Sequence, residues 1–396
     1  MTGSGAVTGS GTIILPEDAL DPYVTHPPTR RLLTGPGLPA DSDLLTFGAL
    51  RAGGPRTVAE VTGDPVFLPA DLRDQLVIGA LRNPAGPETE SVLLDGATGE
   101  VSTACLLPGR TAPADRLPLA PSLRTLTDFV AATHEMAGRR GRFASYEGRF
   151  GPKAVTGMSQ RLLALFEESA GGEVPPFWRT VALVRPLALV AGPPADAALT
   201  LDLPGRLLDQ EFGQGRVMRF EDVDFPAALA HGPTRRFLRE TGLPEDGPLF
   251  HLDTDVPLPT LAEYYEDERP YVLTPDQLPA DADRLIRLGG LAGDDSLVVD
   301  GTTGAILEWS EPDARLYALN TDVSTLAFTL WLFHRERTIA ESLPREPAGE
   351  ARGHLPTTTT RTLTAVDPTG LTRKDGHHYW TRTLTRALRR ETAAAL

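Results

Sequence analysis

The stretch HGPTRRFLRETGLPEDGPLF, residues 231–250, decides the fold, because an earlier part of the chain repeats it. The earlier copy, HPPTRRLLTGPGLPADSDLL, begins 205 positions before it, at residue 26. About half of the aligned positions are identical, whereas chance gives roughly one or two matches. The identical pairs include Thr29/Thr234, Arg30/Arg235 and Gly37/Gly242. The chain is therefore a tandem duplication of one module.

Two further blocks repeat in the same order. SVLLDGATGEV, residues 91–101, recurs as SLVVDGTTGAI, residues 296–306, again 205 positions later. LAPSLRTLTDFVAATHEM, residues 119–136, matches LNTDVSTLAFTLWLFHRE, residues 319–336, at a shift of 200. Because the three blocks are collinear, the duplication covers most of each half of the chain.

The repeated blocks predict an α+β module. A short helix in PTRRFLRETGLP, residues 233–244, should end at Gly242, since glycine tolerates the left-handed conformation of a helix C-terminus. Residues 296–309 predict a hairpin whose D-G turn gives Gly301 a positive φ. The third block predicts an amphipathic helix capped by Ser122 or Asp322. We therefore expect two tandem modules, each a mostly antiparallel sheet packed by helices.

The chain should divide into two domains, because 396 residues exceed the usual size of a single core. The loop-like sequence ESAGGEVPP, from residue 168, places the boundary near 175 and gives domains 13–175 and 176–396. Residues 177–215 have no counterpart in the first copy, and their apolar runs favour a structured connector. The Thr-rich tail, 347–364, is expected to be loose, before a final turn and a basic helix.

The charge balance bears on partners and on localisation. A net charge of −15 disfavours direct contact with nucleic acid and attracts basic protein surfaces, although it could equally serve solubility. The single cysteine, Cys105, has no intrachain partner, and the first residues lack the features of a signal peptide. The most apolar stretch, from Val181, is interrupted by Arg185 and prolines. These features predict a cytoplasmic protein without a membrane span.

The sequence contains no recognisable catalytic, cofactor or metal site. It has no CxxC, HExxH or GxSxG motif, the leader GSGAVTGSG does not match a phosphate loop, and His377 and His378 have no neighbouring ligands at suitable spacing. His134 and His334 occupy equivalent places on a predicted helix face, where core histidines bonded to backbone are expected more than catalytic bases. The repeated Arg-Arg pairs are interpreted as structural. We therefore expect a protein that is not an enzyme.

One acidic stretch is a candidate for partner binding. Residues 253–268, DTDVPLPTLAEYYEDE, contain six carboxylates and two tyrosines but no lysine or arginine. Tyrosine beside carboxylates suits recognition of a basic protein surface, although a solvated loop would look similar. The candidate residues here are Asp253, Asp255, Tyr264, Tyr265, Glu266, Asp267 and Glu268.

The second copy resembles the SUKH superfamily, specifically its fourth subgroup of bacterial immunity proteins. The resemblance spans about residues 217–341 and rests on TRRFLRETGLP, PLPTLAEYYEDE, the DGTTG hairpin with Trp309, and LNTDVSTLAFTLWLFHRE. The first copy looks like a diverged member, having GALRAGGPRTVAEV from residue 48 where the second has its acidic stretch. The resemblance implies a non-enzymatic protein that neutralises a polymorphic toxin, often a nuclease or nucleic-acid deaminase, and adds Trp309 to the candidate site.

Two other functions compete with toxin binding. A duplicated interaction module could be a cytosolic scaffold or regulatory adaptor that associates with itself or with other proteins. An enzyme using His134 or His334 would need a nearby nucleophile or metal, which the sequence does not supply. Toxin binding predicts stoichiometric association with a basic protein, whereas the scaffold predicts oligomers.

Overall fold

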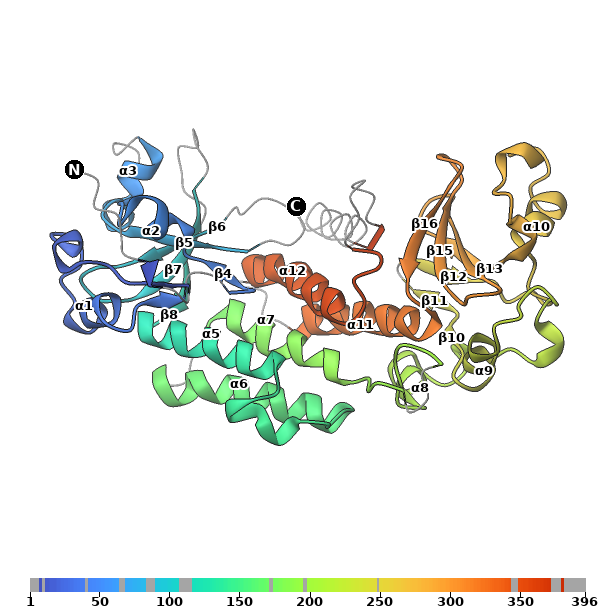
Figure 1. The fold of residues 1–396 in the computed structure, drawn as a ribbon, viewed down its shortest axis with the longest axis horizontal. Helices are drawn as coiled ribbons and strands as arrows, with labels where there is room; N and C mark the ends of the chain where they lie inside the picture. The colour runs from blue at the N-terminus through green and yellow to red at the C-terminus, as the bar shows by residue number, and fades with distance from the viewer. Residues whose placement is uncertain are drawn as a thin grey trace. The chain divides into compact units, whose positions relative to one another are not determined.

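The computed structural model describes residues 7–8, 11–39, 42–63, 68–82, 90–106, 116–170, 174–194, 198–247, 249–342, 348–371 and 379–380. The chain forms two compact units (Figure 1). Unit 1 comprises residues 1–148, 156–183 and 347–357, and unit 2 comprises 149–155, 184–346 and 358–396. The expected boundary near 175 lies inside the second segment of unit 1, so the ranges 13–175 and 176–396 stay a prediction of where the repeats divide.

Unit 1 is built on a five-stranded antiparallel sheet of order β4-β5-β6-β7-β8, with helices α5 to α7 packed together beside it (Figure 1). Phe129 of α5 stacks on Trp178 of α7, whose indole N–H donates to the Leu119 carbonyl on β8 at 2.7 Å. The strands are β1 Val7–Thr8, β2 Thr12–Ile13, β3 Leu38–Pro39, β4 Leu45–Thr46, β5 Leu76–Leu81, β6 Glu90–Leu94, β7 Val101–Cys105 and β8 Leu117–Ala120. The helices are η1 Glu17–Leu20, α1 Pro27–Thr34, α2 Gly48–Gly53, α3 Val58–Thr62, α4 Ala70–Arg73, α5 Leu123–Ala137, η2 Gly141–Tyr146, α6 Pro152–Ala170 and α7 Pro176–Val184.

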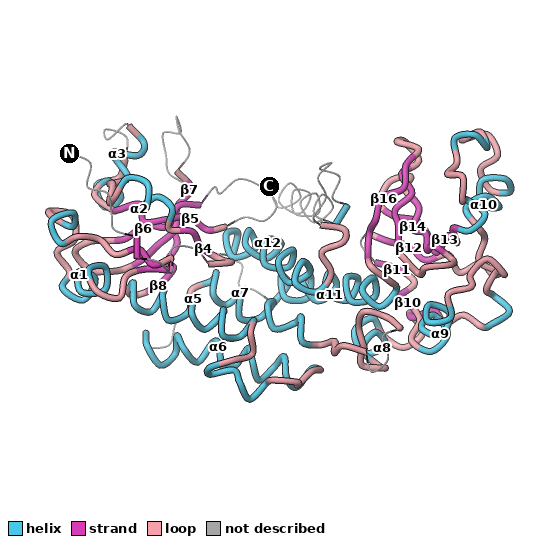
Figure 2. Tube along the Cα trace, viewed as in Figure 1, coloured by secondary structure: helices cyan, strands magenta, loops and turns pink. Residues whose placement is uncertain are grey.

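Unit 2 is built on a six-stranded antiparallel sheet of order β11-β12-β13-β14-β15-β16 (Figure 2). Its strands are β9 Val217–Met218, β10 Leu243–Pro244, β11 Asp246–Gly247, β12 Phe250–Leu252, β13 Leu285–Leu291, β14 Ser296–Asp300, β15 Ile306–Ser310 and β16 Arg315–Asn320. Its helices are η3 Arg185–Leu189, α8 Leu207–Phe212, η4 Asp222–Asp224, α9 Gly232–Glu240, α10 Leu261–Asp267, η5 Pro275–Gln277, η6 Ala282–Arg284 and α11 Val323–Ser342. Helix α12, Ala348–Val366, contributes its residues up to 357 to unit 1 and the rest to unit 2. The expected connector, 177–215, thus holds α7, η3 and α8.

The two units repeat one another in detail, which confirms the predicted duplication of an α+β module. Strand β5 has an irregularity between Val77 and Gly79, and β13 has the same irregularity between Arg287 and Gly289. A Cβ on Gly79 would lie 2.1 Å from a backbone oxygen of β4, and one on Gly289 would lie 2.0 Å from a backbone oxygen of β12. Only glycine permits these close approaches, so both copies retain it.

The hairpin at residues 296–310 forms as predicted, but the conformation expected for Gly301 was wrong. Positive φ occurs instead at Gly304, where φ is 78°. Asp300 explains the difference, because its Oδ1 accepts the backbone N–H groups of Thr302 and Thr303 at 2.8 and 2.9 Å and so winds the turn before the chain reverses. Gly301 is required for space, since its Cβ would lie 2.1 Å from the Ala228 carbonyl oxygen.

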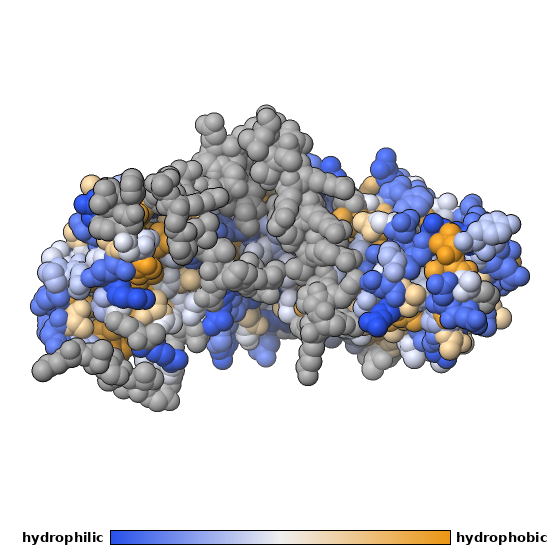
Figure 3. Space-filling view, turned by 90° about the horizontal axis from the view of Figure 1, so that it is seen from above, coloured by the Kyte–Doolittle hydropathy of each residue, from blue (hydrophilic) through white to orange (hydrophobic). Residues whose placement is uncertain are grey.

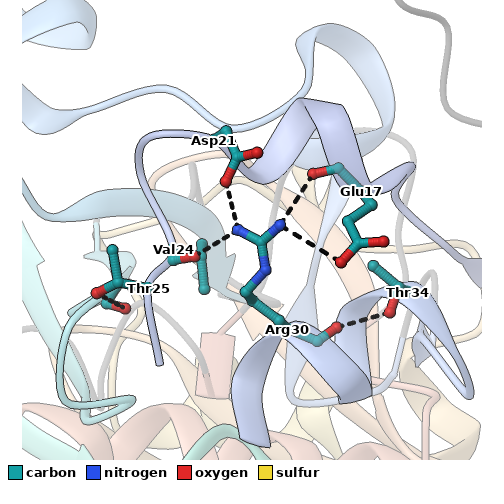
Figure 4. A network of polar contacts seen from close by, with 7 residues as sticks. Glu17, Asp21, Val24, Thr25, Arg30 and Thr34 are labelled. Carbon is teal, nitrogen blue, oxygen red and sulfur yellow. Dashed lines mark hydrogen bonds and ion pairs between the residues drawn. The ribbon is translucent and has the colours of Figure 1, made fainter. Parts of the chain in front are cut away.

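The first arginine of each repeated Arg-Arg pair makes ion pairs within its own copy. The Arg30 guanidinium donates to Asp21 at 2.6 Å and to the Val24 carbonyl at 2.8 Å, and it lies 3.6 Å from the Glu17 carboxylate (Figure 4). Its hydrogen bond to Asp21 raises the pKa of Arg30. In unit 2 the equivalent Arg235 lies 3.7 Å from Asp222. Each arginine therefore fixes the segment that enters the first helix of its copy.

Two expectations about the C-terminal helices were wrong. Helix α11 is not amphipathic over its first half, because every residue from Val323 to Phe333 is buried, with α8, α9 and β16 packed around the helix. The Thr-rich tail is not loose but forms α12, and its threonines are largely buried. Threonine is accommodated there because its hydroxyl can bond back to the helix, as Thr362 Oγ1 does to the Thr358 carbonyl at 2.9 Å.

Candidate functional site

Helix α10 carries four of the eight predicted partner-binding residues, and its sequence explains why it forms. Thr260 precedes it as the N-cap and accepts the backbone N–H of Glu263, while the Glu263 carboxylate accepts the Thr260 backbone N–H at 2.8 Å. Leu261 and Tyr265, four residues apart, share one face of the helix and are buried against the sheet. The acidic residues are thereby left on the opposite side.

Two of the predicted contact residues, Tyr265 and Trp309, are core residues. They are 3 % and 1 % exposed, so neither presents a surface to a partner. The Trp309 indole N–H donates to the Tyr265 hydroxyl at 3.0 Å, and that hydroxyl donates to Glu311 at 2.8 Å. Burial, together with the hydrogen bond to Glu311, raises the pKa of Tyr265. These residues anchor α10 to strand β15, and the sequence missed this because a tyrosine within an acidic run resembles a surface residue.

Asp253 and Tyr264 belong to a second anchor. Arg287 of β13, which is buried, forms an ion pair with Asp253 and donates to Ser296 at 3.2 Å. The Tyr264 ring covers this guanidinium, with 3.9 Å between the guanidinium carbon and the ring centroid. Asp253 thus neutralises the charge of Arg287, and the Tyr264 ring stacks on its guanidinium. Sequence analysis did not identify Arg287 as part of the site, because it enters from a strand about twenty residues away.

The remaining four candidate residues form an exposed acidic surface. Asp255, Glu266, Asp267 and Glu268 are exposed, and the described residues provide no ion-pair partner for any of them. The nearest following cation, Arg269, is 3.1 Å from Glu311 and is therefore engaged. We call these four carboxylates the acidic face. Asp255 lies on the loop before α10, Glu266 and Asp267 lie on its last turn, and Glu268 is its C-cap.

Exposed apolar side chains accompany the acidic face. Tyr271, four residues after the end of α10, is 98 % exposed, and Val256 and Val272 are 47 % and 43 % exposed. Figure 3 shows small hydrophobic groups among the hydrophilic residues that dominate the described surface of that view. An exposed aromatic beside carboxylates provides both contact area and charge, which is the composition of many protein-binding surfaces.

Unit 1 has the same helix without the same chemistry. Helix α3 is capped by Thr57 and Glu60 in the arrangement of Thr260 and Glu263, and Val58 is buried where unit 2 has Leu261. The T-x-x-E spacing in both copies was a sequence signal for this equivalence. Because α3 lacks the acidic and tyrosine residues, the acidic face is a property of unit 2.

Within the described residues, the histidines and other candidate reactive groups form no catalytic constellation. His134 is exposed and bonded to Arg140, which makes the expectation of a core histidine wrong, and partly buried His334 packs on Phe212 at 4.6 Å. Among the described residues no three His, Cys, Asp or Glu side chains are placed to hold a metal ion, and Cys105 on β7 is partly buried. His377 and His378 lie outside the described residues. No helix in the described ranges is long and apolar enough to cross a membrane.

Comparison with known proteins identifies one family. A family model described as SUKH-4 immunity protein matches residues 2–179 and again residues 203–386. The two matches divide the chain as the internal repeat does. No curated protein and no solved structure matches the chain.

Proposed function

Because the chain belongs to the SUKH-4 immunity protein family, we propose that it binds and neutralises a polymorphic toxin in the cytoplasm of the bacterium that makes it. The toxin is proposed to be a nuclease or a nucleic-acid deaminase, whose substrate groove is basic. An acidic protein can occupy such a groove in place of nucleic acid, which agrees with the net charge of −15.

The acidic face of unit 2 is the surface proposed to contact the toxin. Its four carboxylates are exposed and lack ion-pair partners among the described residues, so no internal pair must break when a basic surface approaches. The helix that carries Glu266 and Asp267 and ends at Glu268 is fixed by the buried Tyr265 and Trp309. A fixed charged surface loses little conformational entropy on binding.

A charge-reversal experiment tests the acidic face. Full-length protein and the variant Glu266→Lys/Asp267→Lys/Glu268→Lys are used as baits in the native cell lysate, and bound proteins are identified by mass spectrometry. The wild type should retain one stoichiometric basic protein with a nuclease or deaminase domain. The association rate constant of each bait with this captured protein is then measured at low salt. The variant should associate at least about tenfold more slowly than the wild type, because electrostatic steering is lost.

A matched control distinguishes the effect of where the charges lie from the effect of the total charge. The variant Glu147→Lys/Glu167→Lys/Glu168→Lys changes the net charge equally at exposed positions of unit 1. It should keep the association rate within about threefold of wild type, since steering depends on where charge lies. Equal slowing by the two variants would remove the acidic face from the proposal, and recovery of only the protein itself would favour a scaffold.

A further inference from the structure

Unit 1 contains a pocket that is lined in part by polar residues. It has a volume of about 380 Å³, within the range of small-ligand sites. Its walls come from the β5, β7 and β8 region and the start of α7. The polar residues that line it are Gln75, Asp95, Glu100, Ser102 and Arg116.

The strand registers show how the pocket arose between the copies. Gln75 of unit 1 is equivalent to Leu285 of unit 2, and Ser102 is equivalent to Leu307. In unit 2 these two leucines pack in the core beneath α10. Glu100 is equivalent to Ala305, since each carbonyl accepts the N–H of the turn aspartate, and Arg116, one residue before the printed register, is equivalent to Leu316. Four positions that are apolar in unit 2 are therefore polar in unit 1, at the place where unit 1 has a cavity.

The buried polar groups of the pocket retain hydrogen-bonding capacity. Gln75 is 4 % exposed, and the described residues give its side chain one hydrogen bond, from Ser102 at 3.3 Å. A carboxamide oxygen accepts two hydrogen bonds and a hydroxyl oxygen accepts two, so both can still accept. A ligand that supplies N–H donors can use this open accepting capacity.

In unit 2 an arginine bonds to the carboxylate of Asp300, which is equivalent to Asp95. In both copies the aspartate that begins the turn uses Oδ1 to accept two backbone N–H groups, as Asp95 does from Ala97 and Thr98. The second oxygen of Asp300 accepts the Arg284 guanidinium at 3.4 Å. The position equivalent to Arg284 in unit 1 is Asp74, so Asp95 Oδ2 receives no intramolecular guanidinium from it. Neither Asp95 nor Glu100 has an ion-pair partner in the described part of the chain.

We propose that the pocket of unit 1 binds a guanidinium group supplied by a ligand, taking the place that Arg284 occupies in unit 2. Asp95 Oδ2 and Glu100 accept its N–H groups, and Gln75 and Ser102 accept the remainder. A planar guanidinium matches two carboxylates because its five N–H donors lie in a fixed fork. Arg116 also lines the pocket, and its own guanidinium forms an ion pair with Asp71 at 3.6 Å. The group could belong to a small molecule or to an arginine side chain of a polypeptide.

Calorimetric titration of the full-length protein tests this. The ligands are agmatine, N-acetyl-arginine amide and, as the uncharged isostere, N-acetyl-citrulline amide. Binding of one equivalent of agmatine or the arginine amide, without binding of the citrulline amide, supports the pocket. Binding of both cationic ligands indicates that a polypeptide arginine is accepted, whereas binding of agmatine alone indicates a small molecule. Absence of binding by both at millimolar concentration overturns the proposal.

Matched variants locate the binding. Asp95→Asn keeps the acceptor for the turn but removes the charge, and it should weaken binding by about tenfold or more, the effect of one charge-assisted hydrogen bond. Asp300→Asn makes the same change in unit 2 and should leave the affinity unchanged. Gln75→Leu/Ser102→Leu installs the residues of unit 2 and should abolish binding. Equal affinity of wild type and Asp95→Asn, with unchanged melting temperatures, would overturn the assignment.

The site is independent of the function proposed above. It lies in unit 1, so the acidic-face variant of unit 2 should bind the cationic ligands as wild type does. Failure of the guanidinium titration leaves toxin binding by the acidic face untouched, and the reverse also holds.

Discussion

Replacing Gly301 by alanine should destabilise unit 2 because the backbone leaves no room for a side chain. The new Cβ would lie 2.1 Å from the Ala228 carbonyl oxygen and 3.0 Å from the Arg284 carbonyl oxygen. Two backbone hydrogen bonds prevent the turn at Gly301 from moving away from these neighbours. His231 N donates to Gly301 O at 2.8 Å, and Gly301 N donates to Arg284 O at 2.9 Å. Overpacking and weakening of these bonds together cost about 2–4 kcal/mol.

Scanning calorimetry measures this effect. For a unit of this size, about 3 kcal/mol corresponds to a fall of roughly 5–10 °C in melting temperature. Gly96→Ala should do the same to unit 1, because its Cβ would lie 1.9 Å from the Tyr23 carbonyl oxygen. Gly205→Ala is the control, since its Cβ would meet nothing within 4 Å. A Gly301→Ala protein that melts within about one degree of wild type would refute the close-approach argument.

Three further substitutions test other parts of the structure. Tyr265→Phe should cost about 1–3 kcal/mol in urea unfolding, because it leaves the Trp309 N–H and Glu311 without their shared partner, and an unchanged midpoint would contradict the anchor. Burial lowers the pKa of His354 to about 4, even with the Glu90 carboxylate at 3.4 Å, so the stability contributed by the neutral imidazole is complete above about pH 6.5 and is lost as pH falls toward 4. His354→Gln should flatten this pH dependence of the unfolding free energy by up to about 3 kcal/mol. Parallel curves of unfolding free energy against pH for the two proteins would contradict it. Asp367→Ala should cost about 3 kcal/mol at pH 7, since its buried carboxylate accepts from Asn320 and Thr321, and the loss should shrink in acid as that carboxylate protonates in the parent protein.

The duplication and the hairpins could be predicted because they depend on local rules that repeat in the sequence. Gly242 ends helix α9 with φ at 77°, and Ser122 and Asp322 cap the helices that follow. These features follow from backbone geometry within a few residues. The same is true of α10, whose T-x-x-E cap was visible although its significance was missed.

The errors concern residues whose environment is set by distant parts of the chain. The threonines of α12 have modest helix propensity, but burial and hydroxyl bonds to the preceding turn outweigh it. Tyr265 and Trp309 meet across 44 residues, and their distance in sequence hides the contact. The pocket in unit 1 depends on Gln75 facing Ser102 from a neighbouring part of the sheet. Side-chain contacts of this kind require the strand register, which composition and periodicity do not supply.

The most direct test of the account is an inhibition titration with the captured basic partner. Its cleavage or deamination of nucleic acid is measured while full-length protein is added, with the acidic-face variant in parallel. The account predicts that activity falls to zero near one equivalent of wild-type protein and that the variant requires a large excess. Full activity of the partner in the presence of saturating wild-type protein would contradict the proposed immunity function.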